Sequence, residues 1–472
     1  LMPVFHEAVP AFAARLAAMQ AALQPHAADF DIFVLSDSQD AATLAAERAA
    51  VLRLRALPGP ALFHRQRQGQ EGRKAGNIAE WVRRFGGAYE QFLILDADSV
   101  MTAPTLLALV AEMERNPRLG LVQTLPCLTG AATLFARLQE FASVVYGPMI
   151  AHGLAWWHGP QGNYWGHNAM IRTRAFAGAC GLPELPGRKP FGGEIMSHDF
   201  VEAALLIRAG WEVRMRPGLG GSHEQGPPNL PEMARRDRRW CQGNLQHAAI
   251  LTARGLHPLS RLHMATGIAA YASAPLWLGF LLLGIAVSLQ ARFLRPEYFP
   301  ATHSLFPQWP VVESERALWL FTVTLGLLLA PKLLSVIAYA ITSGAIRSAP
   351  RLGRLVVSTM FEILVSALLS PVTMLTQSGQ VVTVLLGRDA GWAPQRREGD
   401  ALGLRDAFAL TWAHVLVGFV LAGMALAVAP LLAGWMAPVL IGLLAAPLLV
   451  SWTASPRAGD WCAAHGLLTP PG

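Results

Sequence analysis

The chain is 472 residues long, enough for two or three domains, and 53% of its residues are hydrophobic while only 15% are charged, against roughly 25% in typical soluble domains. The charge deficit lies after about residue 261, and the formal net charge of +7 fits an anionic membrane surface better than nucleic acid, because arginines flank the apolar segments. Four cysteines lie far apart in the sequence, which argues against a disulfide framework and against a zinc site.

The first part of the chain alternates apolar, strand-like segments with alanine-rich helical segments. The predicted strands are 31–38, 91–98 and 119–126, and the predicted helices are 11–23 and 41–55. This alternation predicts an α/β domain with a largely parallel sheet over residues 1–255. The opening residues, "LMPVFHEAVP", begin inside a predicted strand without a signal peptide, so we expect a domain that is clipped at its N-terminus.

Carboxylates follow two of the predicted strands. In "FLILDADSVM" an apolar run ends at Asp96 and Asp98, and side chains two apart in an extended strand point to the same face. The pair could therefore bind one ligand, although a solvated turn after a strand is the alternative. Asp37 also ends an apolar strand. Because ligands of such sheets bind beyond the carboxyl ends of the strands, we expect these aspartates in one crevice.

Two further motifs are suited to a sugar phosphate. In "GRKAGNIAE", Lys74 lies beside a turn that opens a helix, which is a setting for phosphate contact, with a solvated loop lysine as the alternative. The segment "NYWGHNAMIR" contains Trp165 and His167 in a region rich in aromatic residues. Aromatic rings stack on the apolar faces of sugars, but a buried aromatic cluster would have the same composition.

Two predicted helices carry the remaining candidate residues. Asp199 lies at the start of the amphipathic segment 197–211, where it is either a general base or a first-turn acid that stabilises the helix. In "ARRDRRWCQGN", Arg236 and Trp240 share a helix face and Arg239 lies beside them. A basic helix at a membrane surface is the alternative interpretation of this second segment.

The second part of the chain predicts a helical membrane domain over 256–455, followed by a C-terminal tail over 456–472. Four runs are apolar and long enough to cross a bilayer, and we predict them as spans: 266–290, 317–343, 408–429 and 431–452.

The segment 356–386 is long but contains the polar residues Glu362, Gln377 and Gln380. The loops 344–355 and 387–405 on either side are both rich in arginine, so both should face the cytoplasm, and one full crossing cannot join them. We therefore predict interfacial or re-entrant helices, with a two-span hairpin as the alternative. The three polar residues are candidates for the entrance of a translocation path, or for a helix lying on the membrane surface.

These motifs occur in an order that resembles the processive, membrane-integrated family 2 glycosyltransferases. That family's signature is a strand-end Asp, an Asp-x-Asp, a Thr-Glu-Asp and a Gln-x-x-Arg-Trp. The corresponding residues here are Asp37, Asp96-Ala97-Asp98, Ser197-His198-Asp199 and Arg236-Asp237-Arg238-Arg239-Trp240. His198 replaces the usual Glu, and Arg236 replaces the usual Gln. The longer motifs "YWGHNA", "SHDFVEAAL", "RDRRWCQGNL", "SAPLW" and "SPVTML" are similar to the glucans biosynthesis glucosyltransferase H family over nearly the whole chain.

The resemblance implies an α/β glycosyltransferase A-type (Rossmann-like) catalytic domain fused to an α-helical transmembrane domain. It implies an enzyme that polymerises glucose from UDP-glucose into the β-1,2-linked backbone of osmoregulated periplasmic glucans. The expected location is the bacterial inner membrane, as a multi-pass protein with its catalytic domain in the cytoplasm and the glucan moved across the bilayer. Another processive β-glycan synthase, such as a cellulose or chitin synthase, and a transporter with a nucleotide-binding domain are the alternatives.

The resemblance also implies a role for each candidate residue. Asp199 is the expected catalytic base, and Asp96 and Asp98 are expected to hold Mg²⁺ or Mn²⁺ at the donor diphosphate. Asp37 is expected to contact the uridine half of the donor, and Lys74 the phosphates. The residues expected to bind the acceptor or product are Arg236, Arg239, Trp240, Trp165 and His167. Implied partners are UDP-glucose, the growing β-glucan, the lipid bilayer, acyl carrier protein and a periplasmic glucan-processing protein.

Overall fold

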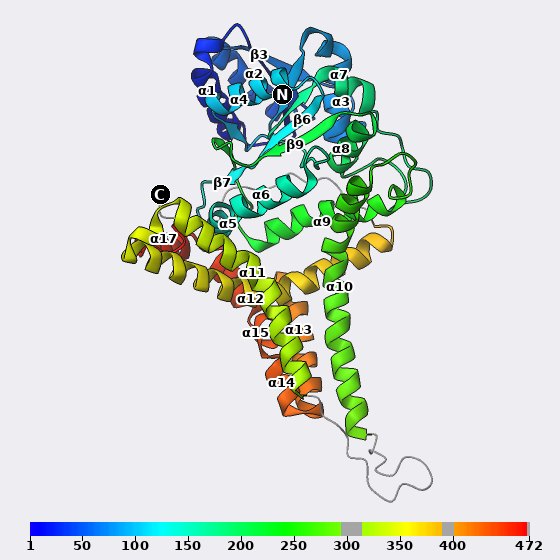
Figure 1. Cartoon of the computed structure of the whole chain (residues 1–472), viewed down its shortest axis with the longest axis vertical. Coiled ribbons are helices and arrows are strands. Elements are labelled where there is room, and N and C mark those ends of the chain that lie inside the picture. Colours follow the sequence, from blue (N-terminus) through cyan, green and yellow to red (C-terminus); the bar gives the residue numbers. More distant parts are fainter. Residues whose placement is uncertain (294–313, 389–400, 470–472) are drawn as a thin grey trace, which may run out of the picture.

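The computed structural model describes residues 1–293, 314–388 and 401–469. It consists of an α/β domain, which forms the upper half of Figure 1, and a group of helices that extends away from it. Helices that lie below the sheets form the interface between the two parts. An α/β domain joined to a helical domain is the fold class expected from the sequence, which is therefore confirmed.

Three small sheets form the centre of the α/β domain. The strands are β1 (Met2–Val4), β2 (Asp31–Ser36), β3 (Ala61–Gln66), β4 (Gln91–Ile94), β5 (Val100–Met101), β6 (Leu119–Thr124), β7 (Cys127–Leu128), β8 (Ala169–Arg172), β9 (Glu212–Arg216) and β10 (Ser222–Glu224). Their orders are β1-β2-β3, β4-β8-β6-β9 and β5-β10-β7. Leu1 joins the first two sheets, because its nitrogen donates to the Leu93 carbonyl at 2.7 Å and its carbonyl accepts from the Leu95 amide at 2.9 Å.

Helices cover both faces of these sheets. Those of the α/β domain are α1 (Val9–Ala22), α2 (Ala41–Arg55), α3 (Arg73–Phe85), α4 (Ala103–Arg115), α5 (Leu134–Val145), α6 (Gly147–His158), α7 (Thr173–Ala179), α8 (His198–Arg208) and α9 (Leu230–Gln246). One buried core packs α1 and α4 against the sheet, and another packs α3, α7 and α8 against it. Short 3₁₀ turns occupy Gln24–His26, Gly86–Ala88, His247–Ala249 and Ala345–Arg347.

Two details of the sheet differ from the sequence-based expectation. The sheet is parallel across β1, β2 and β3, but β8 runs antiparallel to both of its neighbours, β4 and β6. The predicted strand 91–98 ends at Ile94, so Asp96 and Asp98 lie in a turn, closed by the Ser99 amide bonding the Asp96 carbonyl at 2.9 Å. Ala97 and Ser99 are nevertheless buried while both aspartates are partly exposed.

The second part of the chain is helical throughout its described residues. Its helices are α10 (Pro258–Phe293), α11 (Ser314–Thr342), α12 (Ala349–Leu385), α13 (Leu404–Val428), α14 (Pro430–Trp435), α15 (Ala437–Leu444), α16 (Ala446–Thr453) and α17 (Pro456–Ala464). Within the described ranges, α10, α11, α12 and α13 are long and apolar enough to cross a membrane by length and composition. Three of the spans predicted from the sequence therefore correspond to single long helices.

The predicted fourth span, 431–452, is wrong as a single helix. The structure divides it into α14, α15 and α16, and each begins with a proline in its first turn. Proline lacks an amide hydrogen and clashes with the preceding turn, so it is tolerated at the start of a helix but ends a helix that approaches it. Pro438 and Pro447 therefore break an apolar run that is long enough to span.

The segment 356–386 lies in one unbroken helix, α12, which continues through Pro371, so the structure does not form the two-span hairpin. The apolar stretch that makes α12 a candidate span is 44% buried inside the protein, whereas the corresponding stretches of the other three long helices are 6% to 28% buried. In Figure 1, α12 runs across the molecule from the side of α17 to a position below α9. This helix therefore packs against protein to a greater extent than the other three long helices do.

Polar contacts attach α12 to the α/β domain. Gln380 Nε2 donates to the Ala234 carbonyl at 2.8 Å, and Gln377 Nε2 donates to Asp237 Oδ2 at 3.3 Å, so both glutamines bind α9. Glu362 accepts from Tyr146 at 2.8 Å and from Lys332 of α11 at 2.8 Å. These three polar residues hold helices together, which is a structural role that the sequence alone did not indicate.

The arginine-rich loops on either side of α12 allow a test of its topology. We predict that 344–355 and 387–405 both face the cytoplasm; residues 389–400 of the second loop lie outside the described residues. Single cysteines at Ser348 and at Gly403 should resist a membrane-impermeant thiol reagent added to intact cells, and a cysteine at Phe293, at the far end of α10, should react. Strong labelling at either loop would contradict the prediction.

Candidate active site

The candidate site lies where β4 and the loop before β8 meet the starts of α3 and α8. Lys74, in the first turn of α3, forms an ion pair with Asp96, and its Nζ donates to the Gly166 carbonyl at 2.9 Å. The helix begins after Gly72, which adopts φ of +66°, a left-handed conformation that glycine tolerates without strain. One ammonium group therefore links the turn after β4 to the loop before β8.

Gly166 brings Asp199 to the same place. Its φ is +90°, and a Cβ at this position would lie 3.3 Å from Asp199 Oδ2. Asp199 lies in the first turn of α8, and its Oδ1 accepts from Ser197 Oγ at 3.0 Å. The positive end of a helix dipole stabilises a carboxylate in this position. Lys74 and Asp96 thus lie on one side of Gly166, and Asp199 lies on the other.

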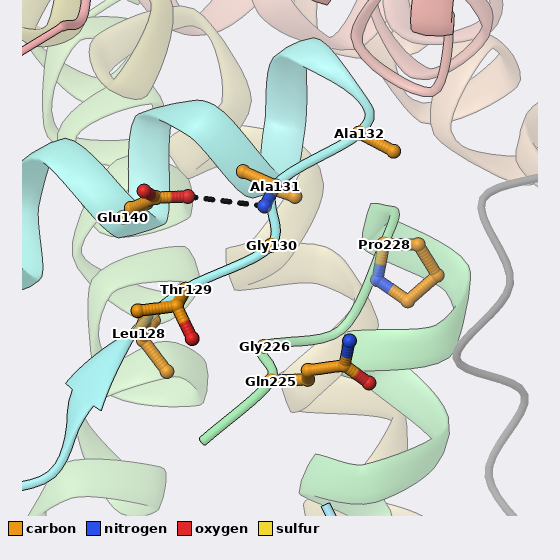
Figure 2. Close-up of a pocket in the computed structure, with 10 residues that line it drawn as sticks. Leu128, Thr129, Gly130, Ala131, Ala132, Glu140, Gln225, Gly226 and Pro228 are labelled. Carbon is orange, nitrogen blue, oxygen red and sulfur yellow. Dashed lines mark hydrogen bonds between the residues drawn. The ribbon is translucent and has the colours of Figure 1, made fainter. Parts of the chain in front are cut away.

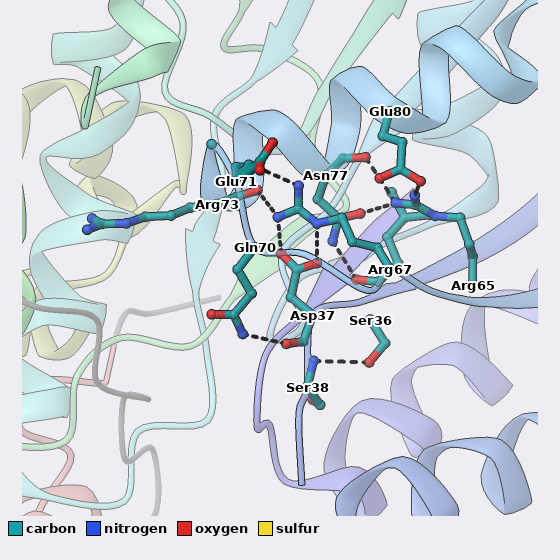
Figure 3. Close-up of polar contacts among 12 residues, drawn as sticks. Ser36, Asp37, Ser38, Arg65, Arg67, Gln70, Glu71, Arg73, Asn77 and Glu80 are labelled. Carbon is teal, nitrogen blue, oxygen red and sulfur yellow. Dashed lines mark hydrogen bonds and ion pairs between the residues drawn. The ribbon is translucent and has the colours of Figure 1, made fainter. Parts of the chain in front are cut away.

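Asp37, at the end of β2, is bound by an arginine that the sequence analysis did not identify. Arg67 donates to both carboxylate oxygens of Asp37 at 2.8 Å, and Figure 3 shows the two side chains facing each other. The same guanidinium donates to the carbonyls of Glu71 at 2.7 Å and Arg73 at 2.8 Å. Burial raises the pKa of Asp37 even though Arg67 opposes that shift.

This arginine has a clear consequence for the site. Asp37 and Arg67 are 7% and 6% exposed, and together they fix the loop that leads into α3 and hence Lys74. The contact between Asp37 and the donor that the sequence suggested stays a prediction. A bidentate arginine–carboxylate pair is rigid as well as strong, so it suits a residue that must orient a neighbouring loop.

His167 and Glu224 form a second polar pair next to the aspartates. His167 Nδ1 lies 3.4 Å from Glu224 Oε2, which brings the start of β8 against the end of β10. Burial disfavours the charged ring of His167, but the carboxylates of Asp96 and Glu224 outweigh it and raise its pKa. Burial, with the nearby charges of Asp98 and Asp96, raises the pKa of Glu224. Glu224 is a site residue that the sequence analysis missed.

The arrangement fits a divalent cation held jointly with a ligand. Among the described residues, no group of three or more His, Cys, Asp and Glu side chains is placed to hold a metal ion. Mg²⁺ in phosphate-transfer sites usually takes one or two carboxylates and completes its shell with phosphate oxygens and water. Asp96 and Asp98, both partly exposed at one turn, meet that requirement.

The helix α9 carries the basic motif below the carboxylates. The Arg236 guanidinium carbon lies 4.3 Å from the centre of the Trp240 ring, which confirms that the two residues share a face. Trp240 is 50% exposed, so part of its side chain is accessible. Arg239 is partly buried beside it, and Trp165 is half-buried with its amide bonded to Gln123 at 3.1 Å.

Neither cavity in the described structure is the site itself. The pocket in Figure 2, of about 30 Å³, lies just beyond Glu224 and is lined by Leu128, Thr129, Gly130, Ala131, Ala132, Ala136, Glu140, Gln225, Gly226 and Pro228. It is far below the roughly 300 Å³ of a small ligand pocket. A cavity of about 500 Å³ lies against Leu1, Phe30 and Gln91, at the opposite ends of the strands from Asp37.

Comparisons with known proteins identify the family of the chain. Residues 91–337 match the family described as Glycosyl transferase family group 2. Glucans biosynthesis glucosyltransferase H of Rhodopseudomonas palustris (strain BisA53) is 52% identical over 100% of this chain and 67% of its own length. The protein of the same name from Shewanella sp. (strain ANA-3) is 45% identical over 100% of this chain and 65% of its own length. The chain thus spans about two thirds of the length of these relatives.

Among solved structures, the chain shows a likeness to the mannosyltransferase PcManGT from Pyrobaculum calidifontis in complex with GDP-Man and Mn²⁺. It is 16% identical, covers 73% of this chain and 85% of its own, and has a TM-score of 0.43.

Replacing Gly166 by alanine tests whether this residue holds the site together. The left-handed φ and the contact with Asp199 predict strain and a displaced carboxylate, so G166A should lower turnover by at least about tenfold. Gly153→Ala, in α6 where an added Cβ meets nothing within 4 Å, is the matched control. Equal turnover of both variants, measured per folded molecule, would show that the close approach at Gly166 is not required.

Proposed function

Since the chain belongs to the glucans biosynthesis glucosyltransferase H family within the group 2 glycosyltransferases, we propose that it transfers glucose from UDP-glucose to a growing β-1,2-linked glucan. The observation that carries this proposal is the meeting of Lys74, Asp96 and Asp199 around Gly166. The Lys74 ammonium can bind a diphosphate, and the Asp199 carboxylate can accept the proton of an acceptor hydroxyl. Gly166, which has no side chain, contacts both residues.

Asp199 is the general base in this proposal. The acceptor hydroxyl gives its proton to the Asp199 carboxylate as its oxygen forms a bond to the anomeric carbon of glucose. The bond between that carbon and the β-phosphate oxygen breaks, and UDP leaves with the electron pair. Because attack and departure occur on opposite faces, the α-linked donor yields a β-linkage. Base catalysis of this kind contributes about 10²–10⁴-fold.

The donor is bound by the other half of the site. Asp96 and Asp98 would hold Mg²⁺ or Mn²⁺, which would neutralise charge on the leaving diphosphate. Lys74 contacts the donor phosphates. Asp37 binds Arg67, which fixes the loop before α3, and this places Asp37 against the uridine half of the donor. The carbonyl of Gly166 accepts a hydrogen bond from the Lys74 ammonium, which also pairs with Asp96.

The acceptor is placed by α9 and by the loop before β8. The open face of Trp240 stacks on the terminal glucose ring, and Arg236, already stacked on the other face, keeps the indole in place. Arg239 extends toward the donor phosphates. Trp165 and His167, in the loop before β8, line the side of the acceptor site opposite α9. Aromatic stacking contributes about 0.5–1.5 kcal/mol beyond the area buried.

The membrane helices serve translocation in this proposal. UDP-glucose is cytosolic and the glucan periplasmic, so α10, α11 and α13, together with the returning segment α14–α16, would cross the inner membrane and guide the product. The contacts of Gln377 and Gln380 with α9 support coupling, because they fix the acceptor helix to α12. Acyl carrier protein and a periplasmic processing protein stay predictions from family resemblance.

The base assignment is tested by Asp199→Asn, which keeps the shape of the side chain and removes its basicity. Glucan synthesis should fall by at least about 10²-fold while UDP affinity stays near wild type. Incorporation of labelled glucose and UDP binding are measured on the same purified protein. If UDP affinity falls together with turnover, Asp199 is a donor-binding residue and not the base.

The metal assignment is tested separately. Asp98→Ala should abolish detectable synthesis, and excess EDTA should do the same to the wild-type protein until Mg²⁺ or Mn²⁺ is restored. Asp29→Ala, at an exposed aspartate away from the site, is the control. Full activity in EDTA, or normal activity of the Asp98 variant, would remove the metal from the proposal.

A further inference from the structure

The helix α6 carries an exposed apolar surface that has no role in the mechanism above. Trp156 is 87% exposed and Trp157 is 45% exposed, and Ile150 and Leu154 are exposed on the same helix. A buried aromatic cluster, which the composition of this region allowed, is therefore excluded for these two tryptophans. The sequence of α6 contains no Asp, Glu, Lys or Arg. An uncharged, exposed surface with two tryptophans indicates an apolar partner.

Both ends of α6 contact helices that are long and apolar enough to cross a membrane. At its start, Ser335 Oγ of α11 donates to Met149 Sδ at 3.5 Å. At its end, the rings of Trp157 and of His263 in α10 meet edge to face, with their centres 5.6 Å apart. Trp156 follows Met149 by about two helical turns, so it lies on the face of α6 that meets α11. Figure 1 shows α6 between the sheets and these two helices.

The two contacts lie at the same level of the long helices, which is the boundary of their apolar stretches nearest the α/β domain. On α11, Ser335 lies about 30 Å from the start of the helix at Ser314, at about 1.5 Å per residue, which equals the thickness of a bilayer's hydrocarbon core. On α10, His263 closely follows Arg261, and the next charged residue is Arg292. The helix α6 therefore extends from one long helix to the other where the hydrocarbon of a bilayer would end.

We propose that α6 is an interfacial helix of the catalytic domain, which lies in the headgroup region of the cytoplasmic leaflet with Trp156 and Trp157 inserted among the lipids. Tryptophan is enriched at this depth, because its ring is largely apolar while its N–H can stay in contact with water. A lipid surface fits better than a sugar, because α6 has no carboxylate or amide side chain to bind hydroxyl groups. The inference rests on the proposed crossing of the membrane by α10 and α11, and not on the reaction.

This placement would fix the loop before β8 relative to the membrane. The helix ends at His158, and the loop that contains Gly166 follows it directly. His263 Nε2 lies 3.4 Å from the Gln161 carbonyl, so the start of this loop also contacts α10. An anchored α6 would therefore keep the proposed acceptor side of the site at a constant height above the bilayer.

Depth measurements on the full chain, in vesicles of phosphatidylethanolamine and phosphatidylglycerol, test the proposal. A nitroxide label is attached at Gly153→Cys, which is exposed on α6, meets nothing within 4 Å of an added Cβ and leaves both tryptophans in place. Cys127 is replaced by Ser, because the other three cysteines are buried. Collisions of the label with O₂, which dissolves in lipid, and with a water-soluble nickel chelate should place it about 5–10 Å inside the lipid boundary.

Two further labels serve as matched controls. Leu52→Cys, on the exposed side of α2, should be in water, and Leu328→Cys, in the middle of α11, should be in the bilayer interior. A Gly153 label that is as accessible to nickel as the Leu52 label, or one that is shielded from both reagents by a second copy of the chain, would overturn the proposal. If the Leu328 label is also in water, α11 does not cross the membrane. That result would overturn the proposed crossing together with this inference, whereas a shallow Gly153 label alone would leave the proposed function intact.

Trp156→Glu tests whether this tryptophan anchors the helix. A carboxylate among lipids is costly, so the Gly153 label should move toward water in this variant, with more nickel collisions and fewer O₂ collisions. Trp156→Phe, which keeps an apolar ring, should leave the label at its original depth. An unchanged depth in Trp156→Glu would contradict the insertion of Trp156.

Discussion

The contact of the Lys74 ammonium with Asp96 and with the Gly166 carbonyl is the interaction on which the arrangement of the site depends. It joins the first turn of α3, the turn after β4 and the loop before β8, three segments with no sequence proximity. Upstream, Arg67 fixes the loop that delivers Lys74, and downstream the missing side chain of Gly166 admits Asp199. These contacts together join the proposed donor half of the site to the proposed acceptor half.

The membrane helices reach this site through α9. Gln377 and Gln380 bind α9 from α12, and Glu362 binds both Tyr146 and Lys332, so α12 connects α11 with the α/β domain. Polar groups in an apolar region are costly unless they are paired, which explains why each has a partner here. A shift of α9 would therefore disturb α12, which gives the proposed acceptor helix a physical connection to the apolar helices.

Much of the fold follows from local sequence patterns. The helix 41–55 matches α2, because its amphipathic repeat and the Asp40 cap that bonds the Thr43 amide are local signals. The motif residues Asp96, Lys74 and Asp199 could also be placed, because strand ends converge in an open α/β sheet. Pro438 and Pro447, which break the segment 431–452, are visible in the sequence. The prediction of a single span followed the hydropathy of the segment and gave these prolines too little weight.

Pairings between distant residues could not be predicted in this way. Arg67 reaches Asp37 across 30 positions, and Glu224 reaches His167 across 57, so neither spacing carries a signal. Sequence patterns therefore located the proposed reacting groups, and tertiary contacts revealed the residues that hold them.

Linkage and anomeric analysis of the product tests the central claim most directly. Purified protein in lipid is supplied with labelled UDP-glucose and Mg²⁺, and the polymer is analysed by methylation and by NMR of the anomeric proton. The account predicts a glucan joined by β-1,2 linkages, formed by the wild-type protein and not by the Asp199→Asn variant. A polymer with another linkage or an α configuration, or synthesis that persists in the variant, would contradict it.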